Sequence, residues 1–215
     1  MGDLKLLLFD MDGVLVDTTS LLKKCYTDLA HYLNTRHPTK EELRDAIQMS
    51  PTRAIGHLFK DQRYEVRHAF KQYWKKNIKQ ASAFIGISEL LDELVARNVG
   101  IGAVTSRNNS DTLTLLTTTG LLNYMRTVIT WGRYRTAKPS PACLLVALSE
   151  TSILPSEAAY VGDQAIDMHA AKNAGMLAVG AVWDLEANKE ELEDAGADII
   201  VEKPKEITRL LKNVF

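Results

Sequence analysis

The sequence has few of the features that mark membrane-bound or nucleic-acid-binding proteins. Its net charge is −1, from 26 basic and 27 acidic residues among 215. Neither a basic stripe nor a block of like charge is visible, which argues against nucleic acid or a membrane surface as a partner. The apolar run at residues 6–9 is far shorter than the roughly 20 residues of a membrane span, and too short for a signal-peptide core. We therefore expect a small molecule as ligand.

Cysteine is also scarce. Cys25 and Cys143 are the only two, they lie far apart within apolar helical patterns, and neither belongs to a C-x-x-C pair. This excludes the common zinc and dithiol motifs and predicts two buried free thiols. The low cysteine content favours a cytoplasmic protein, which we expect to be a monomer or a homodimer.

The sequence also lacks the serine-hydrolase elbow G-x-S-x-G, the H-E-x-x-H zinc motif and the Walker glycine loop.

What the sequence does contain is an alternation of short apolar runs with amphipathic stretches. Nearly continuous apolar character is typical of parallel strands covered on both faces. Strand–helix–strand alternation predicts an α/β fold with a doubly wound, Rossmann-like parallel sheet. The expected strands are 4–9, 100–105, 125–130, 158–162, 177–182 and 198–201, and the expected helices are 88–97, 111–119, 141–149 and 166–173.

The stretch from about residue 18 to residue 80 interrupts this alternation. It has helical periodicity and no convincing strand, and Thr39 with Glu42 resembles a helix-capping box. We expect residues 18–80 to form a small α-helical cap domain inserted after the first strand, while residues 1–17 and 81–215 form the core. Open α/β sheets bind ligands beyond the carboxyl ends of their strands, and we expect the insertion to lie there.

Two carboxylates follow the first predicted strand in Asp10-Met11-Asp12-Gly13. At i and i+2 of an extended segment they point to the same side. A carboxylate can attack phosphorus once the negative charge of the substrate is neutralised, and a second can act as acid and then as base. A bare D-x-D-G is more often a capped turn, so the interpretation depends on further clusters.

Two of these clusters offer groups for a phosphoryl oxygen. Thr105 and Ser106 follow a predicted strand, where hydroxyl and backbone N–H groups can bind phosphate, although Ser and Thr in such places are commonly helix caps. Lys138 precedes a predicted helix and could neutralise both nucleophile and substrate, although an isolated lysine is usually a solvated surface residue.

The last cluster is Gly162-Asp163-Gln164-Ala165-Ile166-Asp167. Asp163 comes directly after an apolar strand, and Asp167 follows one helical turn later on the same face. Magnesium prefers carboxylate oxygens together with several waters. The pattern therefore predicts Mg²⁺ as the cofactor.

Taken together, these clusters resemble the haloacid dehalogenase (HAD)-like hydrolase superfamily, in order and spacing, across nearly the whole chain. The run from Asp10 to Thr18 is similar to its first motif, Thr105 to the second, Lys138 to the third, and Gly162–Asp167 to the fourth. The helical insertion resembles the cap of the phosphoglycolate phosphatase and β-phosphoglucomutase branch.

The resemblance implies a role for each matched residue. Asp10 would be the nucleophile and a metal ligand, and Asp12 the general acid/base whose backbone carbonyl also binds the metal. Thr105 and Lys138 would bind the phosphoryl group, with Ser106 beside them. Asp163 would bind Mg²⁺ directly, and Asp167 through water or by orienting its shell. In the cap, Arg53, with Ser50 and His57 nearby, is a weaker candidate for substrate contact.

Three functions remain open from the sequence. We expect a magnesium-dependent phosphatase that hydrolyses a small phosphomonoester, of the phosphoglycolate or sugar-phosphate type, through a phospho-aspartate. A phosphomutase of the β-phosphoglucomutase type would share the first half-reaction and differ in the acceptor. A non-catalytic, phosphatase-like binding protein is disfavoured because the expected nucleophile, acid/base, lysine and metal carboxylate are all present.

Overall fold

The computed structural model describes residues 4–47, 49, 51–61 and 63–213. It divides into two compact units. One comprises the residues up to Val16 together with those from Ser82 onward, and the other is Asp17–Ala81. Each boundary lies within one residue of the division predicted from the sequence. No helix in the described part of the chain has the length and apolar character needed to cross a membrane.

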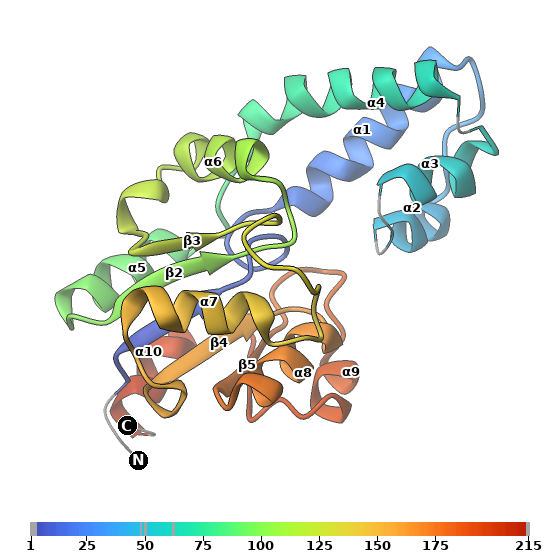
Figure 1. The fold of residues 1–215 in the computed structure, drawn as a ribbon. Coiled ribbons are helices and arrows are strands. Elements are labelled where there is room, and N and C mark those ends of the chain that lie inside the picture. Colours follow the sequence, from blue (N-terminus) through green and yellow to red (C-terminus); the bar gives the residue numbers. More distant parts are fainter. Residues whose placement is uncertain (1–3, 48, 50, 62, 214–215) are drawn as a thin grey trace. The chain divides into compact units, whose positions relative to one another are not determined.

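The larger unit is built on a six-stranded parallel sheet (Figure 1), which confirms the predicted fold class. Its strand order is β3-β2-β1-β4-β5-β6. Successive strands run outward from β1 in both directions, so the topological switch point, where such sheets bind ligands, lies between β1 and β4. The strands are β1 (Leu6–Phe9), β2 (Gly100–Val104), β3 (Thr127–Ile129), β4 (Ala158–Gly162), β5 (Leu177–Ala181) and β6 (Ile199–Val201).

The register of the sheet brings the ends of its central strands level. Phe9, the last residue of β1, pairs with Ala103 of β2 and with Val161 of β4. The next residue, Asp10, continues the ladder, because its backbone N–H donates to the carbonyl of Val161 at 2.8 Å. The side chain of Asp10 is thereby fixed at the carboxyl edge, between the ends of β2 and β4.

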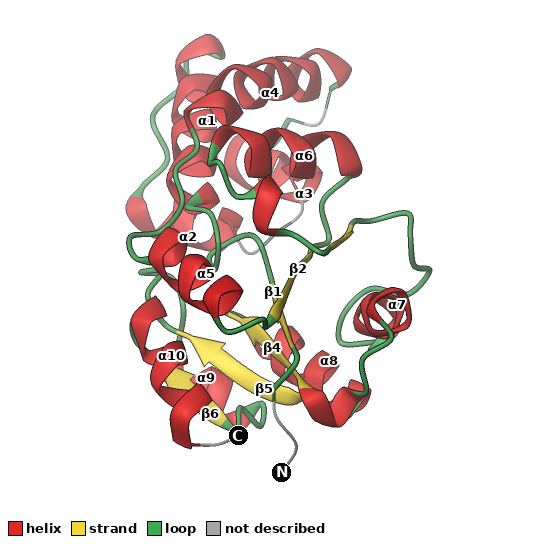
Figure 2. Ribbon diagram, turned by 90° about the vertical axis from the view of Figure 1, so that its left-hand side faces the viewer, coloured by secondary structure: helices red, strands yellow, loops and turns green. Residues whose placement is uncertain are grey.

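Helices cover both faces of this sheet. Figure 2 shows α5 and α10 on one side and α7 and α8 on the other. The four predicted helices are present with ends within two residues of those expected, whereas α9 and α10 were not predicted. The helices of this unit are α5 (Ile87–Ala96), α6 (Asn109–Thr118), α7 (Ala142–Thr151), α8 (Ala165–Ala174), α9 (Lys189–Asp194) and α10 (Pro204–Asn213), with short 3₁₀ turns η2 (Leu122–Tyr124) and η3 (Pro155–Glu157).

In the smaller unit, the described residues form helices joined by loops and include no strand, in line with the helical periodicity of the sequence. The Tyr26 ring of α1 stacks on Phe70 of α4 at 5.1 Å. The capping box is present, since the backbone N–H groups of Thr39 and Glu42 each donate to the other residue's side chain. Cys25 here and Cys143 in the larger unit are both buried free thiols, as expected. The elements are α1 (Thr18–Tyr32), α2 (Lys40–Ile47), α3 (Pro51–Phe59), α4 (Tyr64–Asn77) and the 3₁₀ turn η1 (Ile78–Gln80).

Helix α7 supplies a matched test of this packing. Leu144 is fully buried in the core, whereas its neighbour Leu145 is 46% exposed. We expect Leu144→Ala to lower the free energy of unfolding by about 2–5 kcal/mol, because it leaves a cavity against the sheet. Leu145→Ala should lower it by less than about 1 kcal/mol, since only part of that side chain leaves water on folding. Equal losses in urea unfolding of the two variants would contradict this orientation of α7.

Candidate active site

The turn that follows β1 presents the two aspartates. The backbone N–H groups of Leu15 and Val16 both donate to the carbonyl of Met11, which closes the turn. Gly13 has a φ of +71°, and a Cβ there would lie 2.2 Å from Oδ2 of Asp163. A side chain at position 13 would therefore be strained and would collide with the carboxylate that follows β4. The glycine lets the ends of β1 and β4 approach closely.

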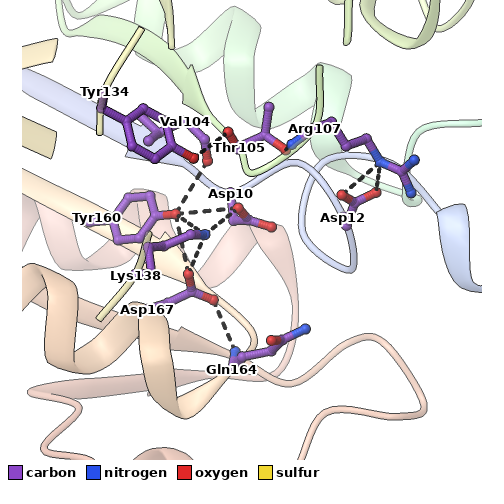
Figure 3. A network of polar contacts seen from close by, with 10 residues as sticks. All are labelled: Asp10, Asp12, Val104, Thr105, Arg107, Tyr134, Lys138, Tyr160, Gln164 and Asp167. Carbon is purple, nitrogen blue, oxygen red and sulfur yellow. Dashed lines mark hydrogen bonds and ion pairs between the residues drawn. The ribbon is translucent and has the colours of Figure 1, made fainter. Parts of the chain in front are cut away.

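Lys138 joins the clusters that follow β1 and β4. Its Nζ donates to Oδ1 of Asp10 at 2.7 Å and to Oδ1 of Asp167 at 2.6 Å. The three side chains are 4%, 10% and 2% exposed, respectively. Figure 3 shows the ammonium group between the two carboxylates. The structure thus brings together three of the predicted site residues, from segments as far apart as positions 10 and 167.

Burial and charge oppose each other in this cluster. Burial disfavours an ammonium ion, but the carboxylates of Asp10 and Asp167 outweigh it and hold the pKa of Lys138 well above its usual value. Burial also raises the pKa of Asp10, to about 7, against the lowering effect of Lys138. Asp167 and Asp12 add to that rise by repulsion. The site therefore carries more negative charge than its lysine compensates.

Tyr160 was not singled out from the sequence. Its hydroxyl is fully buried and lies 3.0 Å from Nζ of Lys138, 3.3 Å from Oδ1 of Asp167 and 3.4 Å from Oδ1 of Asp10. It therefore fixes the lysine and both of its carboxylates in one network (Figure 3). The only signal in the sequence was a hydroxyl-bearing residue inside an otherwise apolar strand.

Asp163 and Asp167 occupy different environments, although both follow β4. Oδ1 of Asp163 is buried and has no hydrogen-bond partner among the described residues. Burial, followed by repulsion from Asp167 and Asp10, raises the pKa of Asp163 well above its usual value. Both oxygens of Asp167 are engaged, since Oδ2 accepts from the backbone N–H of Gln164 at 3.1 Å while Oδ1 accepts from Lys138. Of the two aspartates, only Asp163 has a buried oxygen without a described hydrogen-bond partner.

These features fit a divalent cation. An orphaned, buried carboxylate oxygen and carboxyl groups with raised pKa values are what an added positive charge would stabilise. Among the described residues, no group of three or more His, Cys, Asp or Glu side chains could hold a metal ion. Magnesium does not need such a group, because it keeps several waters and binds through one or two carboxylates. Asp10 and Asp163 are the carboxylates that fit.

Thr105 and Ser106, the two hydroxyl-bearing residues predicted to bind phosphate, directly follow β2. Thr105 is fully buried, and its Oγ1 accepts from the backbone N–H of Arg107 at 3.1 Å. Ser106 is exposed. Tyr134 donates from its hydroxyl to the carbonyl of Thr105 at 3.1 Å. The loop that leads to Lys138 is thereby tied to the strand that carries Thr105.

Asp12 has a cationic partner that the sequence did not reveal. Nε of Arg107 lies 2.7 Å from Oδ1 and 2.8 Å from Oδ2 of Asp12. The two side chains are 17% and 31% exposed. The pair joins residues 95 positions apart, and only the adjacency of β1 and β2 brings them together.

The remaining candidates belong to the smaller unit. Arg53 is exposed on α3 of the smaller unit, His57 is on the same helix, and Ser50 falls outside the described residues. A role for Arg53 in substrate binding stays a prediction.

The chain is similar to known proteins over most of its length. Residues 7–181 match the family described as haloacid dehalogenase-like hydrolase. Pyrophosphatase PpaX of Listeria monocytogenes is 27% identical over 217 residues, covering 99% of this chain and 98% of that protein. Pyrophosphatase PpaX of Bacillus velezensis is 28% identical, with 95% and 94% covered.

The structural comparison points to the same family. A Thermotoga maritima protein described as a "putative beta-phosphoglucomutase" superposes with a TM-score of 0.88 at 25% identity, covering 99% of this chain and all of that one. The predicted resemblance and the prediction of a hydrolase are confirmed, because the family match spans most of the sequence. The chain belongs to the haloacid dehalogenase-like hydrolase family.

Proposed function

We propose that the protein is a magnesium-dependent phosphatase that acts on a small phosphomonoester or on pyrophosphate through a phospho-aspartate. The observation that carries the proposal is the buried ion pair between Asp10 and Lys138 at the carboxyl edge of the sheet. It presents a carboxylate nucleophile beside a fixed positive charge that can neutralise an incoming phosphoryl group.

The first half-reaction transfers the phosphoryl group to Asp10. A carboxylate oxygen of Asp10 attacks the phosphorus, and the bond from phosphorus to the leaving-group oxygen breaks. Asp12 gives a proton to that oxygen, so that the leaving group departs as an alcohol or as hydrogen phosphate. Lys138, Thr105 and Ser106 bind the phosphoryl oxygens in this proposal.

The second half-reaction returns the enzyme to its starting state. Asp12, now a carboxylate, takes a proton from a water molecule as the water oxygen attacks the phosphorus. The bond between phosphorus and the Asp10 oxygen breaks, which releases inorganic phosphate and restores both side chains. One residue thus acts as acid and then as base.

Asp10, Asp163 and the carbonyl of Asp12 are the groups that would hold magnesium, with Asp167 acting indirectly. When bound, the ion supplies positive charge that offsets the excess of carboxylates and the charge of the phosphoryl group. The unpartnered oxygen of Asp163 supports this assignment.

The names of the similar proteins support the substrates proposed for this protein. Proteins named pyrophosphatase match the chain over nearly its whole length, which adds pyrophosphate to the phosphomonoesters expected from the sequence. The similarity to the Thermotoga maritima protein favours a phosphomutase as the second candidate. A mutase would convert a sugar phosphate into its isomer with little release of phosphate.

We expect a phosphate-release screen with magnesium to separate these functions and to identify Asp10 as the nucleophile. Its panel contains pyrophosphate, phosphoglycolate, hexose phosphates and p-nitrophenyl phosphate. Asp10→Asn should lower kcat/KM by about a thousandfold or more, because an amide is a poor nucleophile. Asp194→Asn, on the exposed face of α9, is the matched control and should keep wild-type activity. Near-normal turnover by Asp10→Asn with an unchanged melting temperature would overturn the mechanism.

Asp12→Asn tests the order of the two steps. p-Nitrophenolate leaves without help from an acid, so this variant should still phosphorylate itself, whereas hydrolysis of the phospho-aspartate lacks its base. Intact-protein mass spectrometry should therefore detect a phosphorylated enzyme in Asp12→Asn. The double variant, which carries both Asp10→Asn and Asp12→Asn, should show no phosphorylated enzyme. Equal phosphorylation of both proteins would place the nucleophile elsewhere.

Magnesium should stabilise the folded protein independently of turnover. A ligand at about 100 times its Kd stabilises the native state by about 2.7 kcal/mol, which for this chain length raises the melting temperature by several degrees. We expect thermal melts with magnesium and with EDTA to show this shift for the wild type and for Asp194→Asn. The shift should be largely lost in Asp163→Asn, and a full shift in that variant would contradict the assignment.

A further inference from the structure

The turn that carries Asp12 is closed by hydrogen bonds of its own. We call residues 11–16 the Asp12 turn, in which the backbone N–H groups of Leu15 and Val16 donate to the carbonyl of Met11. These bonds determine the shape of the turn but not its place at the edge of the sheet. Its place depends on contacts with other segments of the larger unit.

Two segments far along the chain donate to the Asp12 turn. Nε1 of Trp183 donates to the carbonyl of Val14 at 3.0 Å. The backbone N–H of Phe84 donates to the carbonyl of Leu15 at 3.1 Å. Because the first of these donors is a side chain, a substitution can remove it and leave the backbone unchanged. The two half-reactions proposed above make no use of Trp183.

The loop that carries Trp183 is itself anchored. Trp183 is the second residue after β5, and the backbone N–H of Val182, between them, donates to the carbonyl of Val201 at 3.0 Å. Asp184, the next residue, is 6% exposed, and its Oδ1 accepts from the backbone N–H of Glu186 at 2.9 Å. The indole is thus presented from a fixed backbone, as a group that holds another in place must be.

The proposed mechanism makes a geometric demand on Asp12. Its carboxylate must lie within hydrogen-bond reach of the water that attacks the phospho-aspartate. A displacement of about 1 Å can lower such a rate by about a hundredfold. The side chain of Asp12 is 31% exposed, whereas that of Asp10 is 10% exposed. Burial therefore restrains Asp12 less, and its position depends on its ion pair with Arg107 and on the placement of the turn.

We propose that Trp183 is a positioning residue, which fixes the Asp12 turn so that Asp12 can act as the base. This inference rests on the proposed function and adds to the site a residue from the β5 side of the sheet. Val14 is fully buried, so its carbonyl would lose the indole donor in a place that water reaches poorly. Restoring a hydrogen bond to that carbonyl would require the turn to move.

The competing explanation is that Trp183 only supports the fold. A purely structural residue affects both half-reactions alike, whereas a residue that acts through Asp12 affects the step that needs Asp12. p-Nitrophenolate leaves without an acid, so phosphorylation by p-nitrophenyl phosphate does not need the proton of Asp12, but hydrolysis of the phospho-aspartate needs its base. The ratio of the two rates separates the explanations, and an unfolded fraction of the enzyme does not change that ratio.

The test compares Trp183→Phe with Leu185→Ala in magnesium-containing buffer, each alone and combined with Asp12→Asn. Trp183→Phe keeps an aromatic ring without the N–H donor. Leu185 is the matched control, since it belongs to the same loop and its side chain is 95% exposed. Rapid quenching and intact-protein mass spectrometry follow the formation and the decay of the phosphorylated enzyme. Melting temperatures monitor folding, and Trp183→His supplies a second variant, which retains a ring N–H donor.

We expect Trp183→Phe to slow the decay of the phosphorylated enzyme by about tenfold or more, because the base is displaced. Its formation from p-nitrophenyl phosphate should change by less than about threefold. Trp183→His should be slowed less than Trp183→Phe, and Leu185→Ala should match the wild type. In the Asp12→Asn background, Trp183→Phe should slow the remaining decay by less than about twofold, since the group that it positions is absent.

Equal slowing of both half-reactions, no slowing of either, or the same slowing with and without Asp12 would refute the role of Trp183 and leave the phosphatase mechanism intact. A complete absence of phosphorylated enzyme in Asp12→Asn would instead refute the proposed function and this inference together.

Discussion

The buried ammonium group of Lys138 is the constraint on which the rest of the site depends. It lies between Asp10 and Asp167, and all three side chains are at most a tenth exposed. Two carboxylates at such depth without a cation would take up protons, since burial and mutual repulsion both disfavour their charged forms. An uncharged Asp10 would be no nucleophile. The lysine therefore lowers the pKa of Asp10 against the effect of burial, which favours the ionised form that the proposed role of Asp10 as nucleophile requires.

This arrangement follows from the order of the strands. Asp10 and Asp167 are far apart in the sequence, but β1 and β4 are neighbours, and Gly13 and Gly162 leave no side chain where their ends meet. A Cβ at Gly162 would lie 2.2 Å from Cβ of Asp167. The glycines thus determine how closely the carboxylates approach, and this closeness produces the excess negative charge that a divalent cation would balance.

The sequence predicts the residues that directly follow strands, because parallel strands end at one edge of a sheet. Asp10, Thr105 and Asp163 were identified in this way. Lys138 lies nine positions beyond β3; it was singled out as a lysine before a predicted helix, and the resemblance to a known family then favoured a role in the site over a surface position. The contacts of Tyr160 and Arg107 could not be predicted, since they depend on strand order and on which face each side chain occupies. Helix α9 was missed because its six residues bury only Leu192 and show no apolar periodicity.

Lys138 and Arg107 differ in burial, and this difference agrees with the roles proposed for Asp10 and Asp12, the carboxylates that they contact. Lys138 and Asp10 are only 4% and 10% exposed, so separating the pair would leave an uncompensated charge in a largely buried place. Arg107 and Asp12 are 17% and 31% exposed, so water can replace a contact that either of them gives up. A nucleophile needs one fixed position, whereas an acid/base must give a proton to one oxygen and take it from another. In the proposed mechanism, the deep burial of Asp10 suits a group that attacks from one position, and the partial exposure of Asp12 suits a group that exchanges a proton with water.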